Sequence, residues 1–234
     1  MSGIRVAPPS APAPPRHRRP TPAPPRGGVL PLGVFFLLVT SALGIAVHAQ
    51  PGSPPFQGLD ERWLGLMTGP HDGPYAAVAA ALNWFGGPLG VVVPVGLLIF
   101  FTVRKRWWSL SYLLTAYLLG GTACVQVIKH LVDRPRPENP LVRVDHGSFP
   151  SGHAAGAALI VVIVGALLVP AARRRAWWIS GALFTVAMMW SRTWLYAHWL
   201  SDTVAGASVG AGTALLLWWL FRRGLAREGA ASRD

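Results

Sequence analysis

From residue 29 onward, long apolar runs alternate with short polar connections. A helix needs about 20 apolar residues to cross the hydrocarbon core of a bilayer, and somewhat fewer where neighbouring helices or a thin bilayer help. Six runs come near that length: Val29–Ala49, Trp84–Val103, Ser109–Ile128, Ala154–Val169, Ala176–Trp190 and Thr203–Phe221. We therefore expect an all-α fold, a multi-pass membrane bundle of six transmembrane helices.

Local features refine this expectation. The fourth run is short as written, so we expect its helix to begin near Ser151, and the fifth is expected to continue into Ser191–Arg192. Pro94 should kink the second helix, because proline lacks the N–H group that a helix interior requires. Asp60–Met67 mixes tryptophan and leucine with charged side chains, which is typical of a short helix lying in the membrane interface.

The two ends of the chain differ from the bundle. Nine of the 22 prolines fall between Pro8 and Pro25, interleaved with alanine and arginine. We therefore expect residues 1–28 to form an extended basic tail. This segment is too long and too rich in proline to be the start of a cleaved signal peptide. Residues 29–224 would form one six-helix membrane domain, and residues 225–234 a short C-terminal tail.

Composition supports the membrane assignment. AVILMFWYC residues make up 52% of the chain and charged residues only 13%, whereas about a quarter of a soluble domain is charged. Both an ordinary soluble globule and a disordered chain are thereby excluded. Cys124 is the single cysteine, which excludes an internal disulfide framework and a cysteine-based metal cluster.

The positions of the basic residues decide how the net charge of +12 is interpreted. With six spans, both termini and the connections 104–106 and 173–175 share one side, and that side carries 15 of the 21 Lys and Arg residues. Basic residues mark the cytoplasmic side, so we expect both termini in the cytoplasm of a cell (plasma or inner) membrane. Membrane lipids, and not nucleic acid, are the expected partners of the basic tail.

The opposite, extracytoplasmic side holds three segments with candidate chemistry: Lys129–Pro137, Pro150–His153 and Ser191–Asp202. Their basic residues run against the charge bias of that side, and ionisable groups beside a membrane are costly unless they have a function. Three of these residues suit one oxyanion, because arginine offers a planar fork and lysine a compact charge: Lys129, Arg136 and Arg192.

The remaining residues of these segments fit phosphoryl transfer. Ser151 and Gly152 precede a helix, where free N–H groups and the helix dipole favour an anion. His198 and Asp202 are four residues apart and share a helical face, so the carboxylate can bind one ring nitrogen and leave the other nucleophilic. His153 is available to protonate a leaving oxygen.

Each segment alone has a simpler interpretation. The first fits a solvated loop, the second an N-cap at Ser151 beside an incidental histidine, and the third an interfacial helix cap. A shared site is favoured because the topology was derived from the apolar runs and the basic residues alone. All three segments nevertheless fall on the same side of the membrane in that topology.

At these residues the sequence resembles the type 2 phosphatidic acid phosphatase family, whose signature is Lys-x6-Arg-Pro, Pro-Ser-Gly-His and Ser-Arg-x5-His-x3-Asp. The three parts match at Lys129/Arg136/Pro137, Pro150–His153 and Ser191/Arg192/His198/Asp202. No defining position departs from the signature, and the six-run plan extends the resemblance to 29–221.

The resemblance implies a role for each matched residue. His198 would be the nucleophile that forms a phosphohistidine, Asp202 would orient it, and His153 would be the general acid. The substrate phosphate would be held by Lys129, Arg136, Ser151, Gly152 and Arg192. The family works without a metal or other cofactor. This fits the sequence, because Lys129, Arg136 and Arg192 would supply the positive charge that a metal ion would otherwise contribute. We add Arg134 as an auxiliary anion contact and interpret His130 and His146 as solvated.

The function implied is a metal-independent lipid phosphatase acting at the extracytoplasmic face on undecaprenyl diphosphate, phosphatidic acid, lysophosphatidic acid or phosphatidylglycerol phosphate. Among these substrates, isoprenoid diphosphate is favoured because of the resemblance to the family and not because of any residue here. Because one histidine must be neutral and the other protonated, we expect a bell-shaped dependence of the rate on pH.

A phosphotransferase that passes the phosphoryl group to an alcohol is the second possible enzyme. A transporter or lipid-phosphate-binding protein is a third, disfavoured because the spans hold few ionisable residues. The membrane plan argues against haloperoxidase chemistry, known in a soluble relative.

Overall fold

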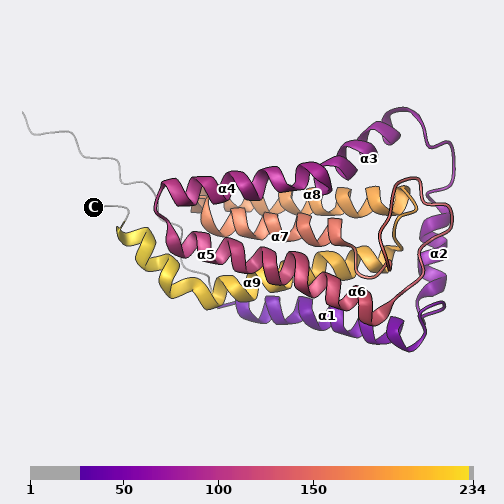
Figure 1. Cartoon of the computed structure of the whole chain (residues 1–234), viewed down its shortest axis with the longest axis horizontal. Coiled ribbons are helices and arrows are strands. Elements are labelled where there is room, and N and C mark those ends of the chain that lie inside the picture. Colours follow the sequence, from indigo (N-terminus) through magenta and orange to yellow (C-terminus); the bar gives the residue numbers. More distant parts are fainter. Residues whose placement is uncertain (1–26, 232–234) are drawn as a thin grey trace, which may run out of the picture.

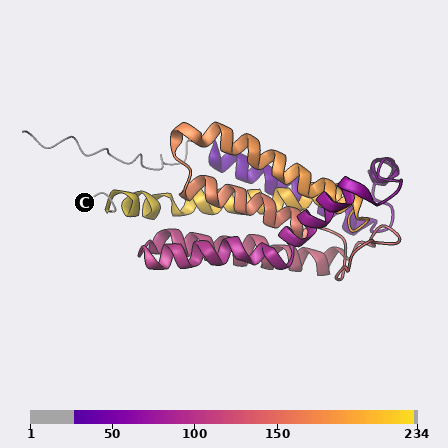
Figure 2. The same ribbon diagram turned by 90° about the horizontal axis from the view of Figure 1, so that it is seen from above.

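The computed structural model describes residues 27–231, which fold into helices with no strand among them. Most of the helices run side by side along the long axis of the molecule (Figure 1), and the view from above shows them in layers (Figure 2). The expected all-α class is confirmed. The helices are α1 Val29–Ala49, α2 Gln57–Gly65, α3 Gly73–Gly86, α4 Val92–Val103, α5 Trp107–Ala116, α6 Cys124–Val132, α7 Gly152–Leu167, α8 Arg174–Trp194 and α9 Leu200–Ala231.

The six expected segments appear as bundle elements, but fewer meet the requirements of a membrane span. In the described part of the chain, α1, α9 and the continuous unit Trp107–Val132 are long and apolar enough. That unit joins α5 to α6 through the π-helical segment Tyr117–Ala123. The bent pair α3 and α4 would make a fourth span. The 16 residues of α7 extend over about 24 Å, less than the hydrocarbon core, and arginines at both ends of α8 lower its hydropathy.

The expected kink at Pro94 is wrong. Pro94 lies in the first turn of α4, where a missing N–H breaks no helical hydrogen bond. The bend of 52° lies earlier, between Gly73–Gly86 and Leu89–Val103. The second segment also begins at Gly73 and not at Trp84, since the proline in its first turn favours a helix start there.

Other boundaries agree with the sequence. Helix α7 begins directly after Ser151, and α8 continues through Ser191 and Arg192 to Trp194. Helix α2 lies where the short helix was expected and crosses one end of the bundle (Figure 1).

Helix α9 is the centre of the bundle and packs mainly on α1 and α7. Two glycines on one face of α9 permit the close contact with α7. A Cβ atom at Gly206 would overlap the Ser151 carbonyl, and one at Gly210 would overlap the Ala155 carbonyl. This contact brings the N-terminal ends of α7 and α9 together.

The segment expected to form the C-terminal tail, residues 225–234, begins as a continuation of α9, which extends to Ala231. Glu228 explains the extension. Its carboxylate accepts hydrogen bonds from Arg106 Nε at 3.1 Å and from the backbone N–H of Trp108 at 2.7 Å, at the N-terminal end of α5. Of the N-terminal tail, residues 1–26 lie outside the described residues.

Candidate active site

The three signature segments meet at one end of the bundle, the end that α2 crosses (Figure 1). The Ser151 N–H donates to the Asp202 carbonyl at 2.9 Å, which joins the second segment to the third. Nη1 of Arg136 lies 3.3 Å from Nε2 of His198, which joins the first to the third. Segments up to 73 residues apart in the sequence therefore form one site.

His198 is held in the connection between α8 and α9 and is almost completely buried, with 3% exposure. Its Nδ1 lies 2.7 Å from the Ser148 carbonyl oxygen and 3.7 Å from Oδ2 of Asp202. The carbonyl can only accept, so Nδ1 carries the proton and the Nε2 lone pair is directed to Arg136. The partner that fixes the tautomer is thus the Ser148 carbonyl, while Asp202 lies just beyond hydrogen-bond range.

Burial lowers the pKa of His198 to about 4, and the positive charges of Arg192 and Arg136 act in the same direction. Asp202 opposes this shift. The imidazole is consequently neutral near pH 7, which is the form that a nucleophile requires.

Asp202 lies in the first turn of α9 and is fully buried. Its Oδ2 accepts the backbone N–H of Trp199 at 2.9 Å, and its Oδ1 accepts Nη1 of Arg134 at 2.7 Å. The carboxylate therefore serves both as the cap of α9 and as the negative charge beside His198.

Lys129 and Arg136 converge, as expected, but in this structure they converge on a carboxylate of the protein. Oδ1 of Asp145 lies 3.3 Å from Nζ of Lys129 and 2.5 Å from Nη2 of Arg136. The Gly147 carbonyl accepts from the same two side chains, at 2.8 and 2.7 Å. Burial raises the pKa of Asp145, but Lys129 and Arg136 outweigh burial and leave the pKa below its usual value.

Arg192 completes the cationic surface from the last turn of α8 and bonds the Asn83 side chain through Nη1. Its Nε and the Ser151 hydroxyl are buried and have no hydrogen-bond partner among the described residues. Buried donors of this kind are rare in native proteins and need an explanation. An anion bound at the N-terminal end of α7 would supply a partner for both.

His153 lies in the first turn of α7, half-buried, with Nε2 3.3 Å from the backbone carbonyl of Asn83. Burial and the nearby Arg192 and His198 all disfavour its protonated form. The two histidines of the signature therefore lie at the same end of the bundle and in one electrostatic environment.

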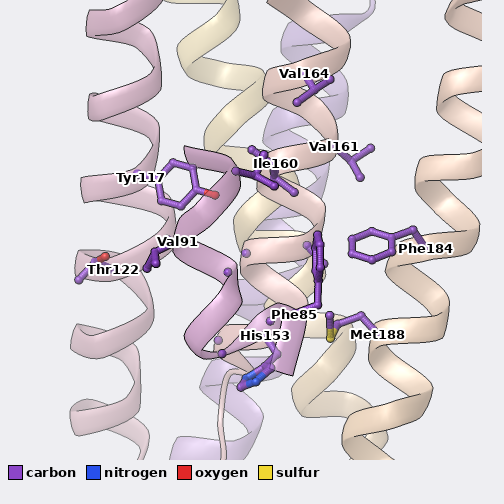
Figure 3. A pocket seen from close by; sticks show the side chains of 18 of the residues that line it. Phe85, Val91, Tyr117, Thr122, His153, Ile160, Val161, Val164, Phe184 and Met188 are labelled. Atoms are coloured by element: carbon purple, nitrogen blue, oxygen red, sulfur yellow. The ribbon is translucent and has the colours of Figure 1, made fainter. Parts of the chain in front are cut away.

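An apolar cavity of about 480 Å³ begins at His153 and Gly152 and continues into the bundle. It is lined by the end of α3, the 3-10 segment Pro88–Val91, the start of α4, α7, α8 and the π-helical segment Tyr117–Ala123. Figure 3 shows His153 at one end and Val164 towards the other. Its other labelled side chains are Phe85, Val91, Tyr117, Thr122, Ile160, Val161, Phe184 and Met188.

The expected anion contact at Arg134 is wrong. Its guanidinium has no solvent exposure and is paired with the carboxylates of Asp60 and Asp202. His130 and His146 are exposed, as expected; their rings stack at 5.3 Å and His146 pairs with Asp133.

Four contributors were not identified from the sequence: Asp60, Asn83, Asp145 and the Ser148 carbonyl. None has a spacing that marks it, because each reaches the site through tertiary contacts. Among the described residues, no group of three or more His, Cys, Asp and Glu side chains is arranged to hold a metal ion.

Comparison with known proteins adds independent information. The family model described as the PAP2 superfamily matches residues 107–225, just over half of the chain. Among solved structures, the first transmembrane PAP2-type phosphatidylglycerolphosphate phosphatase from Bacillus subtilis is similar, with 26% identity and a TM-score of 0.58. The match covers 85% of this chain and 96% of that one. No curated protein sequence matches the chain.

Proposed function

The chain belongs to the PAP2 superfamily, and from this premise we propose that it is a membrane lipid phosphatase that works through a phosphohistidine on His198. The observation that carries the proposal is the state of His198. The ring is buried, neutral and fixed through Nδ1, and its unprotonated Nε2 lies 3.3 Å from Nη1 of Arg136. That arrangement presents a nucleophile directly beside a cation that binds phosphate.

The phosphoryl group would bind where Asp145 now lies, between Lys129 and Arg136. Arg192 and the N-terminal end of α7 face the same region, and the unpartnered Arg192 Nε and Ser151 hydroxyl would donate to its oxygens. The three cations offset the charge that accumulates on those oxygens in the transition state.

The reaction then proceeds in two displacements. The Nε2 lone pair of His198 forms a bond to phosphorus, and the bond from phosphorus to the leaving oxygen breaks. That oxygen takes a proton from His153, whose imidazolium the bound phosphate must stabilise against burial and the charge of Arg192. In the second step neutral His153 accepts a proton from water, whose oxygen bonds to phosphorus as the P–N bond breaks. Phosphate leaves, and both histidines return to their initial states.

The apolar cavity supports a lipid as the substrate. A cavity of about 480 Å³ that starts beside His153 is suited to a hydrocarbon chain whose headgroup reaches the cations. Undecaprenyl diphosphate, phosphatidic acid, lysophosphatidic acid and phosphatidylglycerol phosphate are the substrates we propose to test, with the isoprenoid diphosphate favoured. We place the site at the extracytoplasmic face of the cell membrane, opposite to both termini. A reporter fused after Asp234 and found in the cytoplasm would support this orientation.

The test uses purified protein in detergent with this panel of lipid phosphates, with and without EDTA. We expect release of inorganic phosphate that EDTA does not abolish and that a His198→Ala variant loses by a factor of about a thousand or more. Phosphate on an added alcohol, in place of free phosphate, would identify a phosphotransferase. Binding of lipid phosphates without turnover would identify a transporter or binding protein, and either result would overturn the phosphatase.

A further inference from the structure

Arg134 lies between two carboxylates in the interior of the protein. Its Nη2 donates to Oδ2 of Asp60 at 2.8 Å and its Nη1 to Oδ1 of Asp202 at 2.7 Å. The exposed fractions of the three side chains are 0% for Arg134, 1% for Asp60 and 0% for Asp202. In so dry an environment charge–charge interactions are strong and geometry is narrowly defined.

Asp60 also holds the residue next to Asp202 in the chain. Its Oδ1 accepts the backbone N–H of Ser201 at 2.9 Å, and its Oδ2 accepts the Ser201 hydroxyl at 2.6 Å. The Ser201 hydroxyl in turn accepts Nη1 of Arg134 at 2.7 Å. One side chain of α2 therefore fixes both the guanidinium that binds Asp202 and the backbone that precedes it.

The charges give this arrangement a chemical meaning. Arg134 alone would neutralise Asp202 and weaken its effect on His198. With Asp60 present, two carboxylates share one guanidinium, and the group keeps one net negative charge, 3.7 Å from Nδ1 of His198. A buried net charge of this kind is costly unless a positive partner balances it. The ring of His198 acquires positive charge when Nε2 bonds to phosphorus, and so supplies that partner during the reaction.

We propose that Asp60 is a positioning residue for the reaction, acting through Arg134 and Ser201 to hold the Asp202 carboxylate, with its negative charge, beside His198. The inference rests on the proposed function, and it makes α2 a part of the active site, although α2 lies outside all three signature segments and outside the matched region 107–225.

The test compares Asp60→Asn with Glu61→Gln in the full-length protein. Each variant removes one negative charge from the same helix, but Glu61 is exposed. For Asp60→Asn we expect kcat to fall about tenfold or more, with KM for the lipid phosphate within about twofold, because the loss concerns the transition state and not binding. Glu61→Gln should match the wild type in both constants.

The pH profile separates positioning from a merely structural role. The charged groups that act on His198 are Asp202, which favours its protonation, and Arg192 and Arg136, which oppose it, and His153 is also near enough to interact. Loss of the Asp60 charge removes negative charge from this set. The acidic limb of kcat/KM should therefore move to lower pH in Asp60→Asn and stay in place in Glu61→Gln.

A folded Asp60→Asn protein with wild-type kcat and an unmoved acidic limb would overturn the inference, as would equal losses in both variants. If Asp60→Asn is not recovered folded, Asp60→Glu replaces it: the charge is kept but displaced by one methylene, so kcat should still fall at constant KM. Wild-type kcat in that variant would likewise overturn the inference. A wild-type protein that turns over no lipid phosphate would instead reject the proposed function.

Discussion

The carboxylate of Asp145 lies 2.5 Å from the guanidinium of Arg136, at the position proposed for the phosphate of a substrate. The side chain of Asp145 is 63% exposed, whereas that of Arg136 is only 11% exposed. The protein therefore carries its own anion on a surface loop, and a substrate phosphate that bound at the proposed position would displace it.

Replacing Asp145 by asparagine should strengthen substrate binding. The change removes the competing negative charge, so we expect KM for a lipid phosphate to fall about two- to fivefold with kcat little changed, a modest effect because the pair is partly exposed. Inhibition by inorganic phosphate should strengthen in parallel. Glu138→Gln, on the same loop and exposed, is the matched control. A rise in KM for Asp145→Asn would show that this carboxylate assists binding.

The acidic limb of kcat/KM should lie near pH 4 and not near 6.5, the ordinary pKa of histidine. The buried ring of His198 has a pKa of about 4, and its neutral form is the one that attacks. Measurement of kcat/KM between pH 3.5 and 9 at constant ionic strength locates this limb. A limb near 6.5 would contradict the buried, neutral state of the free enzyme.

The same pKa determines how His198 affects stability. The unfolded chain takes up a proton near pH 6.5, whereas the folded chain does so only near pH 4, so unfolding binds protons between these values. The contribution of His198 is complete above pH 6.5 and is lost as the pH falls towards 4. Thermal unfolding in detergent should show a smaller decline across this window in His198→Ala than in the wild type.

Removal of Arg134 should mainly reduce stability, whereas removal of Arg136 should mainly reduce activity. Arg134→Leu leaves two buried carboxylates without their cation, a cost of about 3–5 kcal/mol. Arg136→Leu removes a cation from a partly open site, and the loss of phosphate binding should raise KM by about tenfold or more. Unfolding temperatures and steady-state kinetics of the two variants give the comparison. An Arg134→Leu protein of normal stability with raised KM would restore the sequence interpretation of Arg134.

Filling the apolar cavity should discriminate against long lipids. Gly156 lines the cavity and a Cβ atom there would meet no neighbour within 4 Å, so Gly156→Leu adds volume without an initial clash. We expect a loss of about tenfold or more in kcat/KM for a long-chain lipid phosphate and little loss for a short, soluble phosphomonoester. Gly96→Leu is the control, since Gly96 is equally open and does not line the cavity. Equal losses on both substrates would show that the hydrocarbon chain of the lipid does not bind in this cavity.

The sequence predicted the parts of this molecule that depend on local pattern. Apolar runs predicted the bundle elements, and the order of the connections between them predicted that Lys129, His153 and His198 lie at the same end of the bundle. The extension of α8 through Arg192 was also expected, because the fifth apolar run is short as written for a span.

The parts that depend on distant partners were not predictable. Nothing in the sequence indicates that Arg134 pairs with Asp60, 74 residues away, and an arginine beside a phosphate motif was reasonably interpreted as an anion contact. Asp145 was missed for the same reason, because a loop carboxylate acquires its role only when two cations fold around it. The bend was expected at Pro94 because proline disrupts a helix interior. Pro94 lies instead in the first turn of α4, so the bend occurs before that helix.

Helix α9 carries Asp202 in its first turn and Glu228 near its last, with about 39 Å of unbroken helix between them. The proposed active site and the contacts of Glu228 with Arg106 and Trp108 thus lie towards opposite ends of one continuous helix. Loss of the Glu228 contacts with α5 would therefore release the last turns of the same helix whose first turn positions Asp202.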